Sequence, residues 1–370
     1  MSSMKRVLLI GLDGFSPDLV EQWIHAGLLP NLERLEKQGA LLPMTGLVPP
    51  ITFPAWTSIV TGVNPGRHGI VDFTEVIPGR YAVRFMNSTD RKVPALWNRL
   101  SDANKSVCVL GVPGTYPPEP VNGILMGGFD SPVSDSIDAS FVYPASVYSK
   151  VRDWRFAEFQ EHRIGASWYA GALASLERKI AVKERVALNL LTERPWDFFM
   201  VVFGEADTVS HHFWPLEDSR SPRHVVVSDA PSHPVRRIYE RLDATVGRLM
   251  EHAGEDTLVM VVSDHGFGGA HIKALHINNF LANHEWLFYT RPRRDVLKRA
   301  ALRWLPIRGR GRLFRMFKGR AERAESGSRF GGIDWSRTRA WSEELDYFPS
   351  VRLNLAGREP EGTVLPEHYE

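Results

Sequence analysis

The sequence has almost no cysteine, no long apolar run and almost no net charge. Its single cysteine, Cys108, excludes an intrachain disulfide and a zinc site built from several thiolates. The formal net charge of +2 argues against nucleic acid as a partner. No stretch approaches the roughly 18 apolar residues that span a bilayer, so we expect no membrane span. These absences are typical of a cytoplasmic protein in a reducing compartment.

Short apolar runs alternate with helical patterns along the chain. The run Val7–Ile10 stops at Gly11 and is too short for the apolar part of a signal peptide. Runs of this kind predict buried parallel strands at Val7–Ile10, Val107–Leu110, Phe198–Phe203 and Leu258–Val262. Helical patterns cover Pro17–Ala26 and Asn31–Gln38. The alternation predicts an α/β fold with a mainly parallel central sheet and helices on both faces.

Two regions look like insertions into one domain that covers residues 1–370. Residues 131–195 contain an aromatic-rich, helical stretch around Trp154–Leu191, which is either a cap over the site or extra helices covering the sheet. Residues 291–329 are strongly basic. A solvated helical face is the usual explanation for such a run, and a phosphate-rich or membrane-surface partner is the less common one.

Polar side chains follow three of the predicted strands at the point where each strand ends. They are Asp13 after the first strand, Asp207 and His211 after the third, and Asp264 and His265 after the fourth. The carboxyl ends of parallel strands meet at one edge of a sheet, where ligands bind. Each group alone has an ordinary explanation, such as a helix cap or a surface contact. Together, carboxylates and imidazoles at one edge indicate a zinc or manganese site.

A fourth element is the segment from Pro49 to Gly62. Pro54 is suited to opening a helix and Gly62 to ending it. Thr52 would then lie just before the helix N-terminus, where backbone N–H groups and the helix dipole attract an anion. The alternative is that Thr52 is only the N-cap. An anion site beside metal ligands suggests a metal-activated hydroxyl that attacks phosphorus.

These motifs resemble those of the type I phosphodiesterases and nucleotide pyrophosphatases, a branch of the alkaline phosphatase superfamily. The segment from Thr52 to Ile70, which begins Thr-Phe-Pro-Ala-Trp-Thr, resembles the family's nucleophile segment. The other blocks occur in the family's order: Asp13 in Gly-Leu-Asp-Gly, Asp207 and His211 in Asp-x-x-x-His, and the pair Asp264-His265. The resemblance extends from about residue 5 to residue 280, and it implies an alkaline-phosphatase-like core with insertions.

The resemblance also implies a chemistry. Two divalent ions, usually Zn²⁺ with Mn²⁺ possible, would act on a small-molecule phosphate ester. One ion would be held by Asp13, Thr52, Asp264 and His265, and the other by Asp207, His211 and a third histidine. Thr52 would be the nucleophile, and hydrolysis of a phosphodiester or nucleotide pyrophosphate would pass through a phospho-threonine intermediate.

The sequence departs from the family pattern in two places. In eukaryotic nucleotide pyrophosphatases an asparagine that contacts phosphate follows the stretch ending at Val71, whereas this chain has Asp72-Phe73. The sequence is therefore more similar to the broad bacterial and archaeal group of predicted phosphodiesterases. The family's C-terminal metal histidine is not found, and we expect it to be encoded beyond residue 370. His271, His276 and His368 are poorer candidates for that ligand.

Several alternatives stay open on the same core. A phosphomonoesterase or phosphomutase is possible, although the mutases typically use serine. A sulfatase needs a cysteine or serine that is converted to formylglycine, and Thr52 cannot be converted. A non-catalytic binding protein on a decayed phosphatase core is the alternative of another class. His68 and His212 are expected to support the structure rather than bind metal.

Overall fold

The computed structural model describes residues 6–129, 136–156, 166–227, 230–290, 318–343 and 350–369. The chain divides into two compact units. The first comprises Met1–Ile70 with Asn87–Ile272, and the second comprises Val71–Met86 with Lys273–Glu370. Every residue of the predicted site belongs to the first unit.

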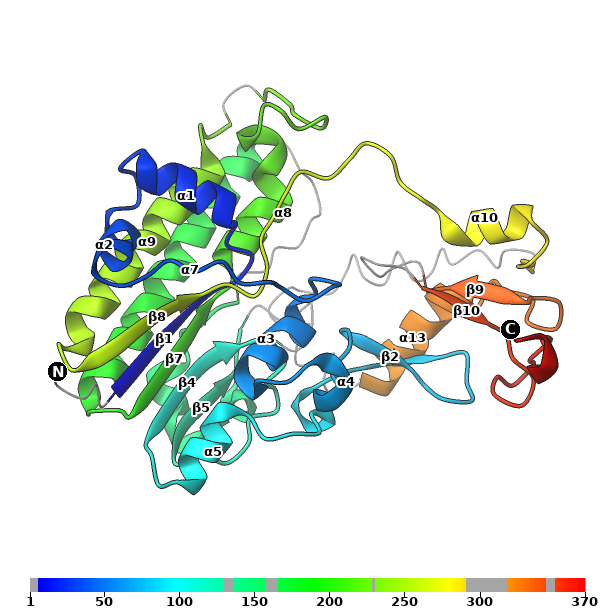
Figure 1. Cartoon of the computed structure of the whole chain (residues 1–370), viewed down its shortest axis with the longest axis horizontal. Coiled ribbons are helices and arrows are strands. Elements are labelled where there is room, and N and C mark those ends of the chain that lie inside the picture. The colour runs from blue at the N-terminus through cyan, green and yellow to red at the C-terminus, as the bar shows by residue number, and fades with distance from the viewer. Residues whose placement is uncertain are drawn as a thin grey trace. The chain divides into compact units, whose positions relative to one another are not determined.

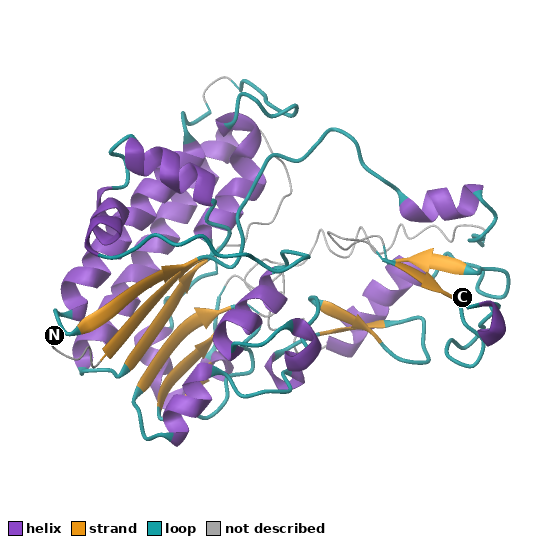
Figure 2. Ribbon diagram, viewed as in Figure 1, coloured by secondary structure: helices purple, strands orange, loops and turns teal. Residues whose placement is uncertain are grey.

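A six-stranded sheet forms the centre of the first unit (Figure 2). Its order is β6-β5-β4-β7-β1-β8, and every pairing is parallel except the one between β5 and β6. The strands are β1 (Arg6–Leu12), β4 (Val107–Val112), β5 (Gly123–Gly127), β6 (Val142–Tyr143), β7 (Phe198–Phe203) and β8 (Thr257–Val262). The predicted α/β fold with a mainly parallel sheet is confirmed, and all four predicted strands are present.

The register of the sheet brings three strand ends to one level. In β1, Leu12 pairs with Phe203 of β7, and Gly11 pairs with Val262 of β8. The residues that follow these strands therefore leave the sheet together at one edge. Since β1 lies between β7 and β8, its loop is flanked by the loops that carry the other predicted ligands.

Helices cover both faces of the sheet, as Figure 1 shows. One face packs against α1 (Pro17–His25), α2 (Pro30–Gln38), α7 (Ala166–Glu193), α8 (Glu205–Glu217) and α9 (Pro234–Ala253). The other face packs against α3 (Thr52–Thr61) and α5 (Leu96–Asp102). Alternate residues of β1 point to opposite faces: Leu8 and Ile10 belong to the first core and Leu9 to the second. Short helices complete the unit: α4 (Pro65–His68), α6 (Tyr148–Val151), η1 (Ser88–Asp90), η2 (Ala139–Phe141) and η3 (Ala145–Val147).

The predicted helical stretch around Trp154–Leu191 is only partly helical. The helix α7 begins at Ala166, and Trp154 lies before it in non-helical chain. Residues 130–135 and 157–165 lie outside the described residues, so the prediction of a cap at 131–195 stays a prediction.

The second unit has its own apolar core. Its elements are β2 (Thr74–Val76), β3 (Val83–Phe85), α10 (Ile277–Asn283), α13 (Lys318–Phe330), β9 (Ala340–Ser342), β10 (Val351–Leu353) and η5 (Pro366–His368). Trp335 and Trp341 pack edge to face in this core, with ring centroids 5.4 Å apart. Residues 291–317, which make up most of the predicted basic insertion, lie outside the described residues. The prediction of one domain with insertions stays a prediction.

Within the described part of the chain, no helix combines the length and the apolar character that crossing a membrane requires.

Candidate active site

Asp13 leaves the end of β1 and is held in place by a tryptophan. Its carboxyl is buried, and its Oδ2 accepts a hydrogen bond of 2.9 Å from the indole Nε1 of Trp56. The indole can lie against β1 because residue 11 is glycine: a Cβ at Gly11 would lie 2.5 Å from the Trp56 ring. Trp56 was missed by sequence reasoning. The signal was its position four residues after Thr52, which places both residues on the same face of the observed helix.

Thr52 is the first residue of α3, not the residue before the helix. The predicted start at Pro54 is wrong by two residues, because proline occupies the third helical position, where its missing N–H is equally harmless. The N-cap is Ile51, whose side chain makes no capping hydrogen bond. The alternative that Thr52 is merely the N-cap is therefore wrong. The Thr52 Oγ1 instead lies 3.4 Å from Nε2 of His265.

The ring of His265 is oriented by the backbone. Its Nδ1 lies 2.8 Å from the carbonyl oxygen of Gly266, which can only accept a hydrogen bond. In the neutral ring the proton is therefore on Nδ1, and the lone pair of Nε2 faces the site. Nε2 lies 3.5 Å from Asp13 Oδ1 and 3.5 Å from Asp264 Oδ2. A backbone carbonyl that fixes this tautomer is the usual support of a metal-binding histidine.

Asp264 is a buried carboxyl with one oxygen unsatisfied. Its Oδ1 accepts a hydrogen bond of 3.2 Å from the backbone N–H of Gly14, while no described residue donates a hydrogen bond to Oδ2. Burial raises the pKa of Asp264 to about 6; the neighbouring His265 lowers this pKa, and the charge of Asp207 raises it. A buried oxygen of this kind needs a partner. A divalent cation would supply it.

The ligand atoms of Asp13, Asp264 and His265 all lie within 4.8 Å of one another. Two carboxylates and one imidazole form a donor set that suits Zn²⁺ or Mn²⁺. Thr52 lies at the edge of the same cluster, through its contact with His265. The structure thus brings together four of the six predicted site residues. We refer to Asp13, Asp264 and His265 as the β1/β8 cluster.

Asp207 and His211 lie on the first turns of α8 and contact each other. Asp207 Oδ1 is 3.3 Å from His211 Nε2. Asp207 packs against the loop after β1 because Gly14, with φ +63°, has no side chain: a Cβ there would lie 2.8 Å from Asp207 Cβ. The His211 side chain is 42% exposed. Among the described residues, this pair is not part of a group of three or more ligands.

The other histidines discussed above do not complete that pair within the described residues. His68 is buried: its Nδ1 accepts a hydrogen bond from the Ile70 N–H, and its Nε2 lies 2.9 Å from Ser58 Oγ. Burial lowers the pKa of His68, so this ring is a neutral packing residue between α3 and α4. Asp72 belongs to the second unit, where its Oδ1 accepts a hydrogen bond from the Phe73 N–H.

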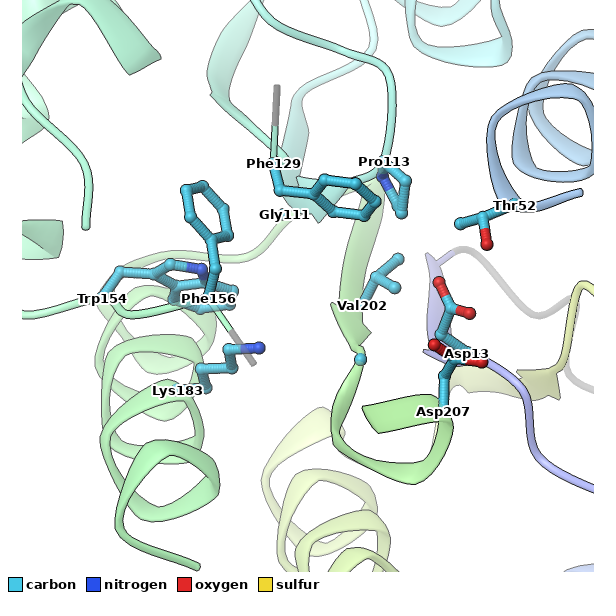
Figure 3. A pocket seen from close by; sticks show the side chains of 11 residues that line it. Asp13, Thr52, Gly111, Pro113, Phe129, Trp154, Phe156, Lys183, Val202 and Asp207 are labelled. Atoms are coloured by element: carbon cyan, nitrogen blue, oxygen red, sulfur yellow. The ribbon is translucent and has the colours of Figure 1, made fainter. Parts of the chain in front are cut away.

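A pocket opens beside the cluster (Figure 3). Asp13, Thr52 and Asp207 lie on one side of the pocket, Lys183 of α7 lies on the opposite side with Trp154 and Phe156, and Phe129 lies beside Pro113 between them. The full lining is Asp13, Thr52, Gly111, Pro113, Phe129, Trp154, Phe156, Lys183, Val202, Gly204 and Asp207. Sequence reasoning missed Lys183. Its signal was a lysine within the apolar stripe of a helix, three residues after Ile180 and four before Ala187, which are both buried.

Comparison with known proteins identifies the family. The family model of type I phosphodiesterase / nucleotide pyrophosphatase matches residues 7–325. The chain belongs to this family. The predicted resemblance to this family is confirmed.

Curated relatives carry phosphodiesterase names. Human ectonucleotide pyrophosphatase/phosphodiesterase family member 1 is 27% identical over 289 residues, which cover 75% of this chain and 25% of that protein. The venom phosphodiesterase CdcPDE of Crotalus durissus collilineatus is 23% identical over 303 residues, which cover 77% of this chain and 29% of that protein. The chain thus spans between a quarter and a third of the length of these relatives.

The solved structures that align with the chain include phosphonoacetate hydrolase from Sinorhizobium meliloti 1021. It superposes with a TM-score of 0.49 at 18% identity, over 80% of this chain and 66% of that one. A putative sulfatase from Bacteroides fragilis superposes with a TM-score of 0.37 at 14% identity, over 72% of this chain and 63% of that one.

Proposed function

We propose that the protein hydrolyses phosphate esters, either phosphodiesters or nucleotide pyrophosphates, with Thr52 as the nucleophile and divalent cations as cofactors. The observation that carries the proposal is the position of the Thr52 hydroxyl, 3.4 Å from His265 Nε2 at the edge of the β1/β8 cluster. The family match supports the reaction class.

The cation next to the nucleophile would be held by Asp13, Asp264, His265 and Thr52. The unsatisfied Oδ2 of Asp264 and the inward-facing Nε2 of His265 are suited to this role. Asp207 and His211 would hold a second cation. Zn²⁺ fits this mixture of carboxylates and imidazoles best, and Mn²⁺ is the next choice. Bound cations would make the Thr52 hydroxyl more acidic and would neutralise charge that develops on the phosphoryl oxygens.

The proposed reaction has two steps, attack by Thr52 and then attack by water. Thr52 Oγ1 loses its proton to solvent and forms a bond to phosphorus as the ester oxygen of the leaving group departs with the electron pair of the broken bond. Water then attacks phosphorus, breaks the bond to Thr52 Oγ1 and returns the hydroxyl. Thr52 is the first residue of α3, so the positive end of the helix dipole would lie next to a phosphoryl group bound there. Trp56 keeps Asp13 in place during both steps through its hydrogen bond.

Turnover of bis-p-nitrophenyl phosphate tests the proposal. We expect release of p-nitrophenolate, loss of this activity in EDTA, and better recovery with Zn²⁺ or Mn²⁺ than with Mg²⁺. Phosphate monoesters, nucleotide pyrophosphates, sulfates and phosphonates assayed in parallel would identify the substrate class. If none of these compounds were hydrolysed with added metal, or if activity survived prolonged EDTA treatment, the proposal would be wrong.

A further inference from the structure

The pocket contains a buried cation that the proposed hydrolysis does not use. Lys183 is the one positively charged residue among the described residues that line the pocket. Its side chain is only 4% exposed. Figure 3 shows its ammonium directed toward the space between the aromatic rings and the carboxylates of Asp13 and Asp207. Burying an ammonium is costly, so a lysine at this position calls for an explanation.

An ion pair with Glu205 explains only part of this burial. Lys183 Nζ lies 2.8 Å from Glu205 Oε1, and the Glu205 side chain is fully buried. The pair offsets the cost of placing either charge in the interior. However, an ammonium carries three N–H donors, and among the described residues neither carboxyl oxygen of Glu205 accepts a hydrogen bond. Glu205 does not line the pocket, whereas Lys183 does.

A second donor lies beside the ammonium. Lys183 Nζ is 5.3 Å from the ring centroid of Trp154, which also lines the pocket. Trp154 is completely buried, and its Nε1 donates no hydrogen bond to any residue in the described ranges. Phe156 also lines the pocket on this side. In such surroundings a hydrogen bond to a charged group is stronger than in water.

We propose that Lys183 and Trp154 form a subsite for an oxyanion of the substrate, either a carboxylate or a second phosphate. This oxyanion is part of an ester group attached to the reacting phosphorus. The subsite faces the Thr52 wall across the pocket, so one substrate can present phosphorus to Thr52 and its oxyanion to Lys183. The proposal rests on the proposed hydrolysis and specifies its substrate class. Lys183 is thereby a specificity-determining residue.

Three p-nitrophenyl phosphodiesters would test the subsite. Their second ester group is phenyl, carboxyphenyl or phosphonophenyl, so all three release the same p-nitrophenolate. The measured quantity is the ratio of kcat/KM for each anionic diester to kcat/KM for the phenyl diester. Because the ratio compares substrates within one protein, a general loss from weaker folding or weaker metal binding cancels. A charged hydrogen bond predicts a ratio of about 10 to 100 for at least one anionic diester.

Two variants remove the cation. Lys183→Met keeps the length of the side chain but leaves Glu205 without its partner. The double variant Lys183→Met/Glu205→Gln removes both charges and therefore avoids an unpaired buried carboxylate. Both variants should bring the ratio to about 1, and Trp154→Phe should lower it by several-fold. Lys150→Met is the matched control, because Lys150 forms an exposed ion pair with Glu193 and does not line the pocket. This control should keep the wild-type ratio.

A ratio of about 1 in the wild type for both anionic diesters would overturn the subsite while leaving the proposed hydrolysis intact. A ratio that stays high in both Lys183 variants would overturn it as well. A preference for one anionic diester over the other would decide between carboxylate and phosphate. If the wild type hydrolysed none of the three diesters, the subsite would be overturned, whereas turnover of a nucleotide pyrophosphate would still support the proposed function.

Discussion

The two groups of candidate metal ligands are built very differently. In the β1/β8 cluster, two carboxyls and an imidazole come from two neighbouring strands and are nearly inaccessible. Each is fixed by a hydrogen bond from outside the cluster: Trp56 to Asp13, Gly14 to Asp264, and His265 to Gly266. Asp207 and His211 come from one helix, and the His211 side chain is 42% exposed. Among the described residues, the β1/β8 cluster is thus a preorganised candidate for a cation site, whereas Asp207 and His211 belong to no group of three ligands.

The largest effect is expected at Thr52, whose Oγ1 lies 3.4 Å from Nε2 of His265 in the β1/β8 cluster. Thr52→Ala should lower kcat at least about 10³-fold, because the covalent nucleophile is lost. Thr52→Ser should keep partial activity, since it retains the hydroxyl. Thr61→Ala, at the other end of α3, is the matched control and should remain active. More than a tenth of wild-type activity in Thr52→Ala would refute the nucleophile assignment.

Zinc titration would show whether the two groups of candidate ligands differ in zinc affinity. We expect one tight site and one weak or empty site, because a catalytic zinc needs three protein ligands and Asp207 with His211 supplies two. Asp264→Asn or His265→Ala should abolish tight binding, whereas His211→Ala should affect only the weak site. Isothermal titration calorimetry on metal-free protein distinguishes these cases. Two tight sites in the wild type would contradict the comparison, and alanine variants of His271, His276 and His368 would then locate the third ligand.

Trp56→Phe tests whether the outer hydrogen bonds preorganise the cluster. The variant keeps an aromatic ring against Gly11 but removes the N–H that holds Asp13. Loss of such a support lowers metal affinity by about 10- to 100-fold. Trp97→Phe is the control, because Trp97 is equally buried and its Nε1 donates to Glu119 instead. Equal losses of zinc affinity in both variants would show that the effect is general destabilisation.

The smallest effect concerns the stability of the metal-free protein. The folded-state pKa of Asp264 is raised to about 6. The unfolded chain therefore loses this proton at lower pH than the folded chain, and the carboxyl destabilises the fold as pH rises from about 4 through 6. In EDTA, Asp264→Asn should be more stable than the wild type by on the order of 1–3 kcal/mol at pH 8 and similar to it at pH 4. Urea unfolding at both pH values measures the difference in unfolding free energy between Asp264→Asn and the wild type. A difference of the same size at pH 4 and pH 8 would contradict the prediction.

Local features predicted the sheet and the cluster, whereas the supporting residues depend on distant contacts. Strands β1 and β7 are apolar runs, and the predicted ligands follow them closely along the chain. The spacing of residues was therefore enough to predict both the strands and the ligands. The strand β6 has only two residues and exists through its pairing with β5, which no local pattern reveals. The proposed roles of Trp56 and Lys183 depend on their contacts with Asp13 and Glu205, which lie elsewhere in the chain. The start of α3 was misplaced because proline fits any position of a first turn.

Mass spectrometry of the reacting protein tests the central claim most directly. Wild-type protein with Zn²⁺ would be mixed with excess bis-p-nitrophenyl phosphate, quenched in acid within one turnover and digested. The proposed mechanism predicts a p-nitrophenyl phosphoryl group on Thr52, at the start of α3, and none in Thr52→Ala. An active protein that carries no adduct on Thr52, or one that carries it on another residue, would contradict the account.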